Sequence, residues 1–405
     1  MTFLFVTYTL LLMFSERFAM LKHISTVKLV LISLFGLGAG LFTLYAHAQS
    51  SPSPLQASWQ AAIHEARMDA DLIGVGGAIL YKGKIVAQAV DGLQIKGKSR
   101  PLETDNLFHI GSISKSMTAT LLARLVENGT LSWDSSVQDT FPNVDMHPDW
   151  NGVTMAHFLT HTSGVQANFP RASQSIWPTS DEALRTARLK AVSALLSNPP
   201  QSKPDEVFRY SNAGITIAGV MAEQITGKSW ESLMHTEVFA PLGMKSAGFG
   251  APQSTQQHPQ PWGHTSTLGF KRPMDPSKHA DNTPIMGPAG IIHMNMRDLL
   301  IFGNEHALGM QGKSTFLKPE TFKRLHTPKL NNYAYGFVVQ PQSKWTEGPI
   351  LWHNGTNTMW YALLVIAPDR QAVFVMTSND GSFKKAETAL FPLPQTFESQ
   401  LTKGN

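Results

Sequence analysis

The 405-residue sequence contains no cysteine. This absence excludes disulfide bonds, thiolate metal sites, a cysteine nucleophile and a lipoprotein anchor, all of which need a thiol. It does not fix the compartment, because a chain of this length can bury a core large enough to be stable without cross-links. Hydrophobic residues make up 42% of the chain and can supply such a core.

Charge is also scarce. Charged residues make up 15% of the chain, below the ~25% typical of soluble domains, and the formal net charge is only +4. A charge balance this weak provides no electrostatic footprint for nucleic acid. The chain does contain 9 Trp, 22 Phe and 7 Tyr, which indicate a packed interior and exclude an intrinsically disordered protein.

Two motifs of hydrolytic enzymes are missing. The sequence has no G-x-S-x-G nucleophile elbow, which argues against an α/β-hydrolase. It has no H-E-x-x-H motif, and its 15 His residues do not cluster with carboxylates at the spacing of metal ligands. We therefore expect no metal site and no cofactor.

The N-terminal part has the layout of a secretory signal. Lys22 and Lys28 precede an apolar run, Leu29–Tyr45, which ends in the small-x-small triplet Ala46-His47-Ala48. This order predicts export to the periplasm or out of the cell, with cleavage after Ala48. The apolar run is slightly longer than the usual ~7–15 residues, so an uncleaved membrane anchor is the alternative.

The chain divides accordingly. Residues 1–48 are predicted to be the signal peptide, with residues 1–19 as an upstream extension if translation begins at Met20. Residues 49–54 are rich in Pro and Ser and are predicted to form an exposed leader. Residues 55–400 are predicted to fold as one domain.

Strand-like segments lie near both ends of this domain. Val75–Leu80 and Lys84–Val90 are separated by a Lys82-Gly83 turn, and Trp360–Ala367 and Gln371–Thr377 form a second hairpin pattern. Helical spacing marks the segments Leu55–Asp69, Lys115–Asn128, Gly214–Ile225 and Met296–Phe302, the last three ended by a glycine. The sequence thus predicts an α+β fold with one antiparallel sheet from both termini and an inserted, mostly helical region.

One motif match is rejected. Gly92–Ser99 fits the phosphate-loop pattern G-x-x-x-x-G-K-[ST], which binds phosphate only where the glycine-rich loop opens a helix. Pro101 follows shortly after Ser99, and residues 100–106 have no helical periodicity. We therefore predict a solvated loop here and no nucleotide site.

The strongest chemical signal is the segment His109-Ile110-Gly111-Ser112-Ile113-Ser114-Lys115, where a helix is predicted to start. Residues i and i+3 share a helix face, so Lys115 would hold its amine beside the Ser112 hydroxyl. A serine hydroxyl needs a neighbouring base to become a nucleophile, and a buried lysine that loses its proton easily can be that base. A capping serine followed by a surface lysine would give the same pattern, so the motif needs support from elsewhere.

Two further motifs supply that support. Tyr210-Ser211-Asn212 stands at the start of a predicted helix and offers a phenol that can relay protons and an amide that can bind a carbonyl. Trp352-His353-Asn354-Gly355-Thr356 precedes the C-terminal strands, where small residues would let a substrate backbone approach a strand edge closely.

The three motifs, in this order and spacing, resemble those of the penicillin-recognising serine hydrolases. This group contains the class C β-lactamases, the D-Ala-D-Ala carboxypeptidases and the β-lactamase-like esterases. The resemblance extends from Leu55 to Asp380 and implies a β-lactamase/transpeptidase-like fold. Three more stretches are similar to the family and are expected to be framework: Leu159–Gly164, Pro241–Met244 and Pro288–Gly290.

The resemblance implies roles for the reactive residues. Ser112 is the nucleophile that becomes acylated, and Lys115 is its proton acceptor or electrostatic partner. Tyr210 is a general base that moves the proton to the leaving group. Whether Lys115 or Tyr210 is the true base stays open, since both arrangements are debated among such enzymes.

The resemblance also implies substrate-binding residues. Asn212 positions the substrate amide, and His353, Gly355 and Thr356 bind the substrate along the strand edge. The backbone N–H groups of Ser112 and Thr356 form the oxyanion hole, which stabilises the tetrahedral intermediate. The segment Gln166–Pro204, rich in Pro and Ser, is expected to be a loop that shapes the pocket.

The third motif departs from the β-lactamase pattern, because His353-Asn354-Gly355 stands where those enzymes have Lys-Thr-Gly. A lysine is a permanent cation that can hold a substrate carboxylate, whereas a histidine with an ordinary pKa of ~6.5 is mostly neutral at pH 7. We expect His353 at the far end of the substrate, where protonation below pH ~6.5 would supply a cation. The departure favours an esterase or peptidase over an efficient β-lactamase.

The sequence therefore predicts an exported serine hydrolase that acts through an acyl-enzyme on a small ester or amide, with esterase activity favoured. The alternatives within this class are a D-Ala-D-Ala carboxypeptidase and a weak class C-like β-lactamase. The alternative from another class is a non-enzymatic protein that binds penicillin or cell-wall peptides. The expected partner is a small ester, amide, peptide or β-lactam; no nucleic acid is expected, and a membrane only if the signal segment stays uncleaved.

Overall fold

A computed structural model describes residues 52–343 and 345–401 of the chain. The predicted signal peptide, residues 1–48, and most of the predicted leader lie outside the described residues. None of the helices in the described part of the chain is long and apolar enough to cross a membrane.

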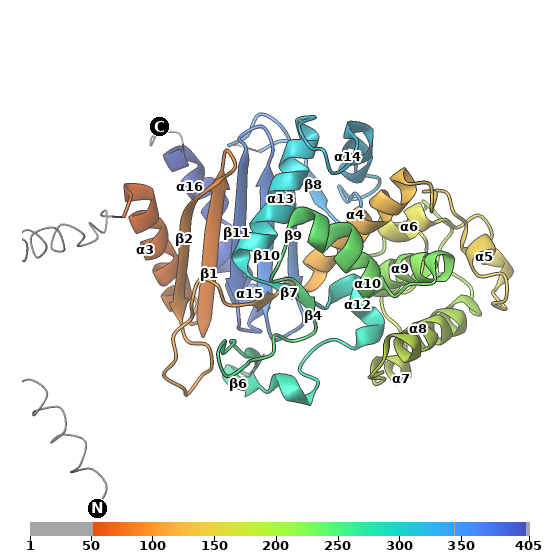
Figure 1. The fold of residues 1–405 in the computed structure, drawn as a ribbon, viewed down its shortest axis with the longest axis horizontal. Helices are drawn as coiled ribbons and strands as arrows, with labels where there is room; N and C mark the ends of the chain where they lie inside the picture. The colour runs from red at the N-terminus through yellow and green to blue at the C-terminus, as the bar shows by residue number, and fades with distance from the viewer. Residues whose placement is uncertain (1–51, 344, 402–405) are drawn as a thin grey trace, which may run out of the picture. The chain divides into compact units, whose positions relative to one another are not determined.

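A six-stranded antiparallel sheet takes its strands from both ends of the described chain (Figure 1). Its order is β2-β1-β11-β10-β9-β8. The strands are β1 (Gly74–Tyr81), β2 (Lys84–Gly92), β8 (Val338–Gln340), β9 (Ile350–Thr356), β10 (Tyr361–Ala367) and β11 (Ala372–Ser378). The pairing of β1 with β11, which places Val75 opposite Ser378, joins the two ends of the domain. The predicted sheet from both termini is confirmed.

Helices cover both faces of this sheet (Figure 1). Helices α3 (Pro54–Asp69), α15 (Phe383–Leu390) and α16 (Leu393–Leu401) lie on one face. Helix α13 (Met296–Met310) lies on the other face, against β1, β10 and β11.

The central strand β10 explains why both faces need cover. All seven of its residues are buried. Leu363 and Val365 belong to the core under α3, whereas Leu364 and Ile366 belong to the core under α13. Successive side chains of a strand point to opposite faces, so a strand that is apolar throughout requires packing on both sides.

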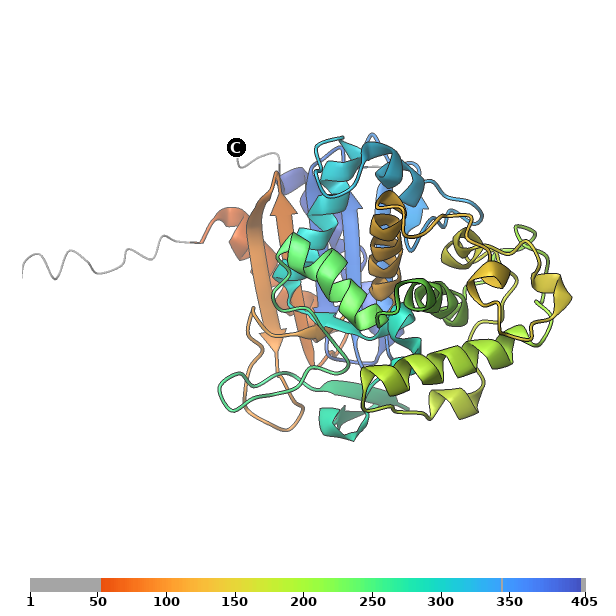
Figure 2. The same cartoon turned by 45° about the vertical axis from the view of Figure 1, so that its right-hand side comes forward.

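The helical region is inserted between β2 and β8, and Figure 2 brings it forward beside the sheet. Its helices are α4 (Ser114–Glu127), α5 (Val137–Thr140), α6 (Met155–Leu159), α7 (Arg171–Gln174), α8 (Asp181–Leu196), α9 (Asn212–Thr226), α10 (Trp230–Met234), α11 (Ala240–Leu242), α12 (Gly287–Gly290) and α14 (Pro319–Leu325), with 3-10 turns η1 (Gly111–Ile113), η2 (Pro148–Trp150), η4 (Pro276–Lys278) and η5 (Pro284–Met286) and the π-helix η3 (His235–Phe239). Two small sheets complete the region, β3-β7-β4 and β5-β6, formed by β3 (Phe108–His109), β4 (Gly248–Phe249), β5 (Gly263–Thr267), β6 (Phe270–Met274) and β7 (Ile292–Met294).

Two predictions about helices are wrong. Gln166–Pro204 is predicted to be a loop, but it contains α8, whose N-terminus is capped by the Ser180 hydroxyl. Helix α13 is predicted to end before Gly303, but it continues through this residue. Gly303 lies against the sheet, where a Cβ would stand 2.6 Å from Val373 Cγ1. This glycine therefore allows close packing of helix on sheet and does not end the helix.

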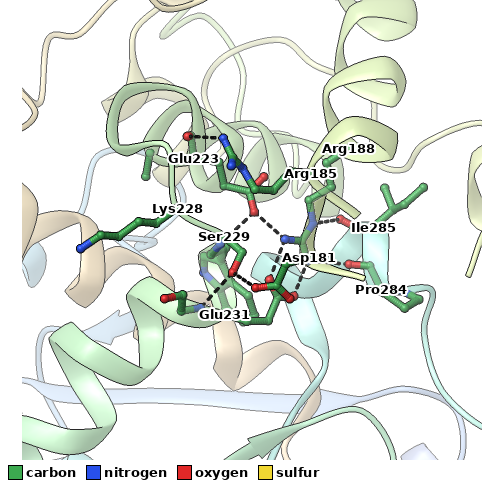
Figure 3. A network of polar contacts seen from close by, with 12 residues as sticks. Asp181, Arg185, Arg188, Glu223, Lys228, Ser229, Glu231, Pro284 and Ile285 are labelled. Carbon is green, nitrogen blue, oxygen red and sulfur yellow. Dashed lines mark hydrogen bonds and ion pairs between the residues drawn. The ribbon is translucent and has the colours of Figure 1, made fainter. Parts of the chain in front are cut away.

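A buried ion network holds the helical region together (Figure 3). Arg188 of α8 is fully buried; its Nη1 lies 2.7 Å from Glu223 and its Nη2 lies 2.6 Å from Glu231. The guanidinium also donates to the carbonyls of Pro284 and Ile285 in η5. Burial alone would lower the pKa of Arg188, but the carboxylates of Glu231 and Glu223 outweigh it and raise the pKa. The network therefore fixes η5 against α8, α9 and α10.

Replacing Arg188 by Met is expected to lower the free energy of unfolding by about 3–5 kcal/mol, because Glu223 and Glu231 would lose the cation that compensates their burial. Chemical denaturation measures this change. Lys190→Ala, at an exposed position of the same helix, is the matched control and should change stability by less than about 0.5 kcal/mol. Equal free energies of unfolding for the two variants would contradict the predicted contribution of the network to stability.

Candidate active site

Ser112 lies in η1, between β3 and α4. Gly111, just before it, has a φ of 52°, and a Cβ there would lie 2.3 Å from the amide nitrogen of Thr356. Gly355 is restricted in the same way, because a Cβ there would lie 2.5 Å from the amide nitrogen of Ser112. The two glycines thus let the turn before α4 touch β9. The backbone nitrogens of Ser112 and Thr356 therefore lie close together.

Lys115 stands in the first turn of α4, and its side chain is completely buried. Its Nζ lies 2.8 Å from Ser112 Oγ and donates to the carbonyl of Ala289 at 2.8 Å. Burial lowers the pKa of Lys115 well below its ordinary value, because the charged amine is removed from water. This environment favours a neutral amine, which is able to accept a proton from the serine hydroxyl.

Tyr210 stands just before α9, and its ring centre lies 4.9 Å from the Nζ of Lys115. The ring of His161 packs on it with ring centres 4.5 Å apart. Burial raises the pKa of Tyr210, and a hydrogen bond with Ser112 offsets only part of this shift. Tyr210 therefore keeps its proton at neutral pH and can donate it. The surroundings of Lys115 thus favour its unprotonated form, whereas those of Tyr210 favour its protonated form.

A pocket of about 270 Å³ opens at Ser112. Five of its lining residues carry side-chain amides, and none of the described lining residues is charged. The lining consists of Ser112, Asn168, Gln174, Asn212, Asn282, Met286, Ala289, Gly290, Thr356, Asn357 and Thr358. Such a surface can form hydrogen bonds to a substrate but offers no ion pair to a substrate carboxylate.

His353 is a predicted substrate-binding residue that lies outside the pocket lining, behind Tyr210, with ring centres 6.3 Å apart. It is only 4% exposed and does not belong to the pocket lining. Its Nδ1 donates to the carbonyl of Asn354, so its Nε2 accepts from the hydroxyl of Tyr333 at 3.1 Å. Burial, together with nearby Lys115, lowers the pKa of His353 to about 3. The expectation that His353 meets the substrate and gains a proton near pH 6.5 is therefore corrected.

The family model for beta-lactamase matches residues 59–393. The chain belongs to the beta-lactamase family. The match includes all three predicted motifs and confirms the family that the sequence resembles.

Proteins similar to this beta-lactamase family member differ in their named activities. Penicillin-binding protein 4 of Amycolatopsis lactamdurans is 24% identical over 350 residues, which are 83% of this chain and 88% of that protein. Esterase EstB of Burkholderia gladioli is 30% identical over 212 residues, which are 50% of this chain and 52% of that protein. A solved beta-lactamase/D-alanine carboxypeptidase from Pseudomonas syringae has a TM-score of 0.70 at 18% identity, over 85% of this chain and 99% of that chain. Its likeness confirms the β-lactamase/transpeptidase-like fold.

The other predicted substrate residues of this family member lie at or beside the pocket. Asn212 and Thr356 line it, and Gly355, the residue before Thr356, packs against η1. Asn168 and Gln174 also line the pocket, so the segment Gln166–Pro204 contributes to its wall as expected.

Sequence reasoning missed six residues of the pocket lining. Asn282, Met286, Asn357 and Thr358 line the pocket without any motif to mark them. Pro288–Gly290 is predicted to be framework, but Ala289 and Gly290 line the pocket, and the carbonyl of Ala289 accepts a hydrogen bond from the Nζ of Lys115. The similarity of this stretch to the family was the signal that could have placed it in the site.

The described residues show no arrangement that suggests a metal or nucleotide site. Within residues 52–343 and 345–401, no group of three or more His, Asp or Glu could hold a metal ion. The loop after β2, which contains the phosphate-loop pattern, forms turns and opens no helix.

Replacing His353 by Lys is expected to destabilise the protein and not to create a carboxylate anchor. The Tyr333 hydroxyl would lose its acceptor, which alone costs about 1–3 kcal/mol, and the new cation would be buried near Lys115. His353→Gln, which keeps an acceptor, is the control. Chemical denaturation and KM values for a neutral and an anionic ester at pH 6 and 8 test this. A lower KM for the anionic ester alone in the lysine variant would contradict the buried placement.

Proposed function

We propose that the protein is an exported serine hydrolase that cleaves small neutral esters or amides through an acyl-enzyme on Ser112. The observation that carries this proposal is the 2.8 Å distance between Lys115 Nζ and Ser112 Oγ at an uncharged, amide-lined pocket. Membership of the beta-lactamase family, whose named members include an esterase, supports it. Export is supported by the sequence pattern of the first 48 residues.

Acylation begins with proton transfer from Ser112 to the neutral amine of Lys115. The freed Oγ attacks the substrate carbonyl, and the new oxyanion forms beside the backbone N–H groups of Ser112 and Thr356. When the tetrahedral intermediate collapses, the bond to the leaving group breaks and Tyr210 donates the proton that the leaving group needs. Lys115 then returns its proton to Tyr210. A water molecule releases the acyl group by the same steps in reverse order.

The raised pKa of Tyr210 and the lowered pKa of Lys115 support this division of roles. A base must be unprotonated and an acid protonated at the working pH. The lowered pKa moves Lys115 towards the first condition, and the raised pKa of Tyr210 satisfies the second. The proposal therefore assigns Lys115 as the base in acylation and Tyr210 as the acid.

The absence of charged residues from the described pocket lining favours neutral over anionic substrates. A D-Ala-D-Ala peptide and a cephalosporin both carry a carboxylate, which would lose its hydration here without gaining a cation. A neutral ester or amide can use the side-chain amides of Asn168, Asn212 and Asn357 as hydrogen-bond partners. We therefore place neutral substrates first, with carboxypeptidase and weak β-lactamase activity behind them.

A substrate panel tests this proposal. The protein is assayed with p-nitrophenyl butyrate, a D-Ala-D-Ala peptide with a free carboxylate, the amide of the same peptide, and a chromogenic cephalosporin. We expect the highest kcat/KM for the neutral ester and a higher kcat/KM for the peptide amide than for the free peptide. Faster turnover of either anionic substrate would contradict the proposal. Covalent labelling without turnover of any substrate would favour a binding protein.

A further inference from the structure

Outside the pocket lining, three segments meet at one buried carboxylate. The side chain of Asp281 is only 3% exposed. Its Oδ1 accepts from the side-chain amide of Asn357 at 3.0 Å and from the backbone N–H of Asn282 at 2.6 Å. The Nε2 of His109 lies 2.9 Å from the same oxygen. One oxygen therefore connects β3, the segment before η5 and the turn after β9.

His109 extends this connection to η1, the turn that contains Ser112. Its ring is fully buried on β3, and its Nδ1 accepts from the backbone N–H of Gly111 at 3.1 Å. Because Nδ1 accepts this hydrogen bond, Nε2 carries the ring proton; it lies 2.9 Å from Asp281 Oδ1 as a close contact that lacks hydrogen-bond geometry. The N–H of Gly111, the His109 ring and the Asp281 carboxylate thus form a continuous chain of contacts.

The two ends of this chain lie beside the two proposed oxyanion-hole donors. Gly111 immediately precedes Ser112, and Asn357 immediately follows Thr356. We propose that His109 and Asp281 are a positioning pair that holds the N–H groups of Ser112 and Thr356 in one orientation. The inference rests on the proposed function, which places the oxyanion between these two groups. Neither residue belongs to the pocket lining, so the role proposed for them is exerted through Gly111 and Asn357.

The burial of Asp281 supports a positioning role over a purely structural one. Its Oδ2 has no hydrogen-bond partner among the described residues. A buried carboxylate with an unused oxygen costs stability compared with an apolar side chain of similar size. Contacts of Oδ1 that orient the turn after β9 and the turn before α4 would offset this cost.

The test compares Asp281→Ala with Asp281→Asn in turnover of p-nitrophenyl butyrate. Alanine removes the acceptor, and we expect kcat to fall about 10–100-fold with KM within about threefold, because oxyanion contacts strengthen only in the transition state. Asparagine keeps an oxygen that accepts from Asn357 and Asn282, and its kcat should stay within about threefold of the unmodified protein.

Binding of phenylboronic acid adds a readout that a structural role would not change. Ser112 adds to the boron, and a boronate oxygen takes the place of the oxyanion. We expect its affinity to fall in Asp281→Ala by about the same factor as kcat. His109→Phe, which keeps the ring volume and leaves the carboxylate in place, should reproduce part of both losses. This variant keeps the test decisive if Asp281→Ala does not fold.

Asp298→Ala is the matched control. Asp298 is a buried carboxylate of α13 that accepts from the backbone N–H and hydroxyl of Ser246, away from the pocket. The Asp298→Ala substitution should lower the midpoint of unfolding and leave kcat for p-nitrophenyl butyrate unchanged.

Two results would overturn the inference: an unchanged kcat in folded Asp281→Ala, or equal losses in the Ala and Asn variants. If Ser112→Ala stays active, the proposed function itself fails. If Ser112→Ala is inactive and folded Asp281→Ala is normal, only the positioning inference fails.

Discussion

Replacing Ser112 by Ala is expected to abolish covalent labelling by a fluorophosphonate and to reduce ester turnover by about 10³-fold or more. The reason is that no acyl-enzyme forms without the hydroxyl that lies 2.8 Å from Lys115 Nζ. Gel fluorescence after labelling and the initial rate with p-nitrophenyl butyrate measure the two effects. Both should disappear together, because one oxygen atom serves both reactions.

Ser114→Ala is the matched control for this prediction. Ser114 is the buried first residue of α4, two positions after Ser112. Its hydroxyl donates to the carbonyl of Gly111 at 2.7 Å. Its loss should cost some stability but preserve the label. Near-normal turnover in the Ser112 variant, or loss of the label only in the Ser114 variant, would show that the nucleophile is assigned to the wrong residue.

Replacing Lys115 by Met should lower kcat/KM about 10²–10⁴-fold, the usual range for a general acid–base group. Methionine fills a similar volume, so the packing around α4 is largely preserved. The variant should still take up the fluorophosphonate slowly, because Ser112 remains. This partial reactivity distinguishes loss of the base from loss of the nucleophile.

The pH profile gives the sharper measurement for Lys115. In the unmodified protein, kcat/KM should fall on the acid side as the amine gains its proton, at a pH well below the ordinary lysine pKa because burial lowers it. In Lys115→Met this acid-side fall should disappear. His353, whose pKa is lowered to about 3, should not contribute a fall between pH 5 and 8. A fall that persists unchanged in the methionine variant would assign the titrating base elsewhere.

Local spacing was sufficient to predict the contact between Ser112 and Lys115. The i, i+3 relation on a helix places one side chain over another, and the structure brings these two atoms within 2.8 Å. The same holds for the strands, because the alternating and all-apolar segments near both ends define β1, β2, β10 and β11. The all-apolar strand β10 also indicates a sheet that is covered on both faces.

The remainder of the site depends on contacts between distant segments, which no local pattern contains. Asn357 and Asp281 meet because two loops fold together, and neither lies in a motif. The burial of His353 depends on Tyr333, which is 20 positions away in the sequence. Helix α8 did have a local signal, the cap Ser180 followed by Asp181 and Glu182, but the surrounding Pro and Ser residues obscured it.

Under the proposed mechanism, the pairing of β1 with β11 sets when the protein can become reactive during its synthesis. Ser378 Oγ donates to the carbonyl of Gly74 across 304 positions of sequence, so β1 leaves the ribosome long before its partner exists. Contacts between such distant segments form slowly and only after the intervening chain is complete. Thr356 of β9 belongs to the same late strands. Under the proposed mechanism, a chain that lacks the last strands therefore contains Ser112 without its second proposed N–H donor, and we expect efficient acylation only after these strands have joined the sheet.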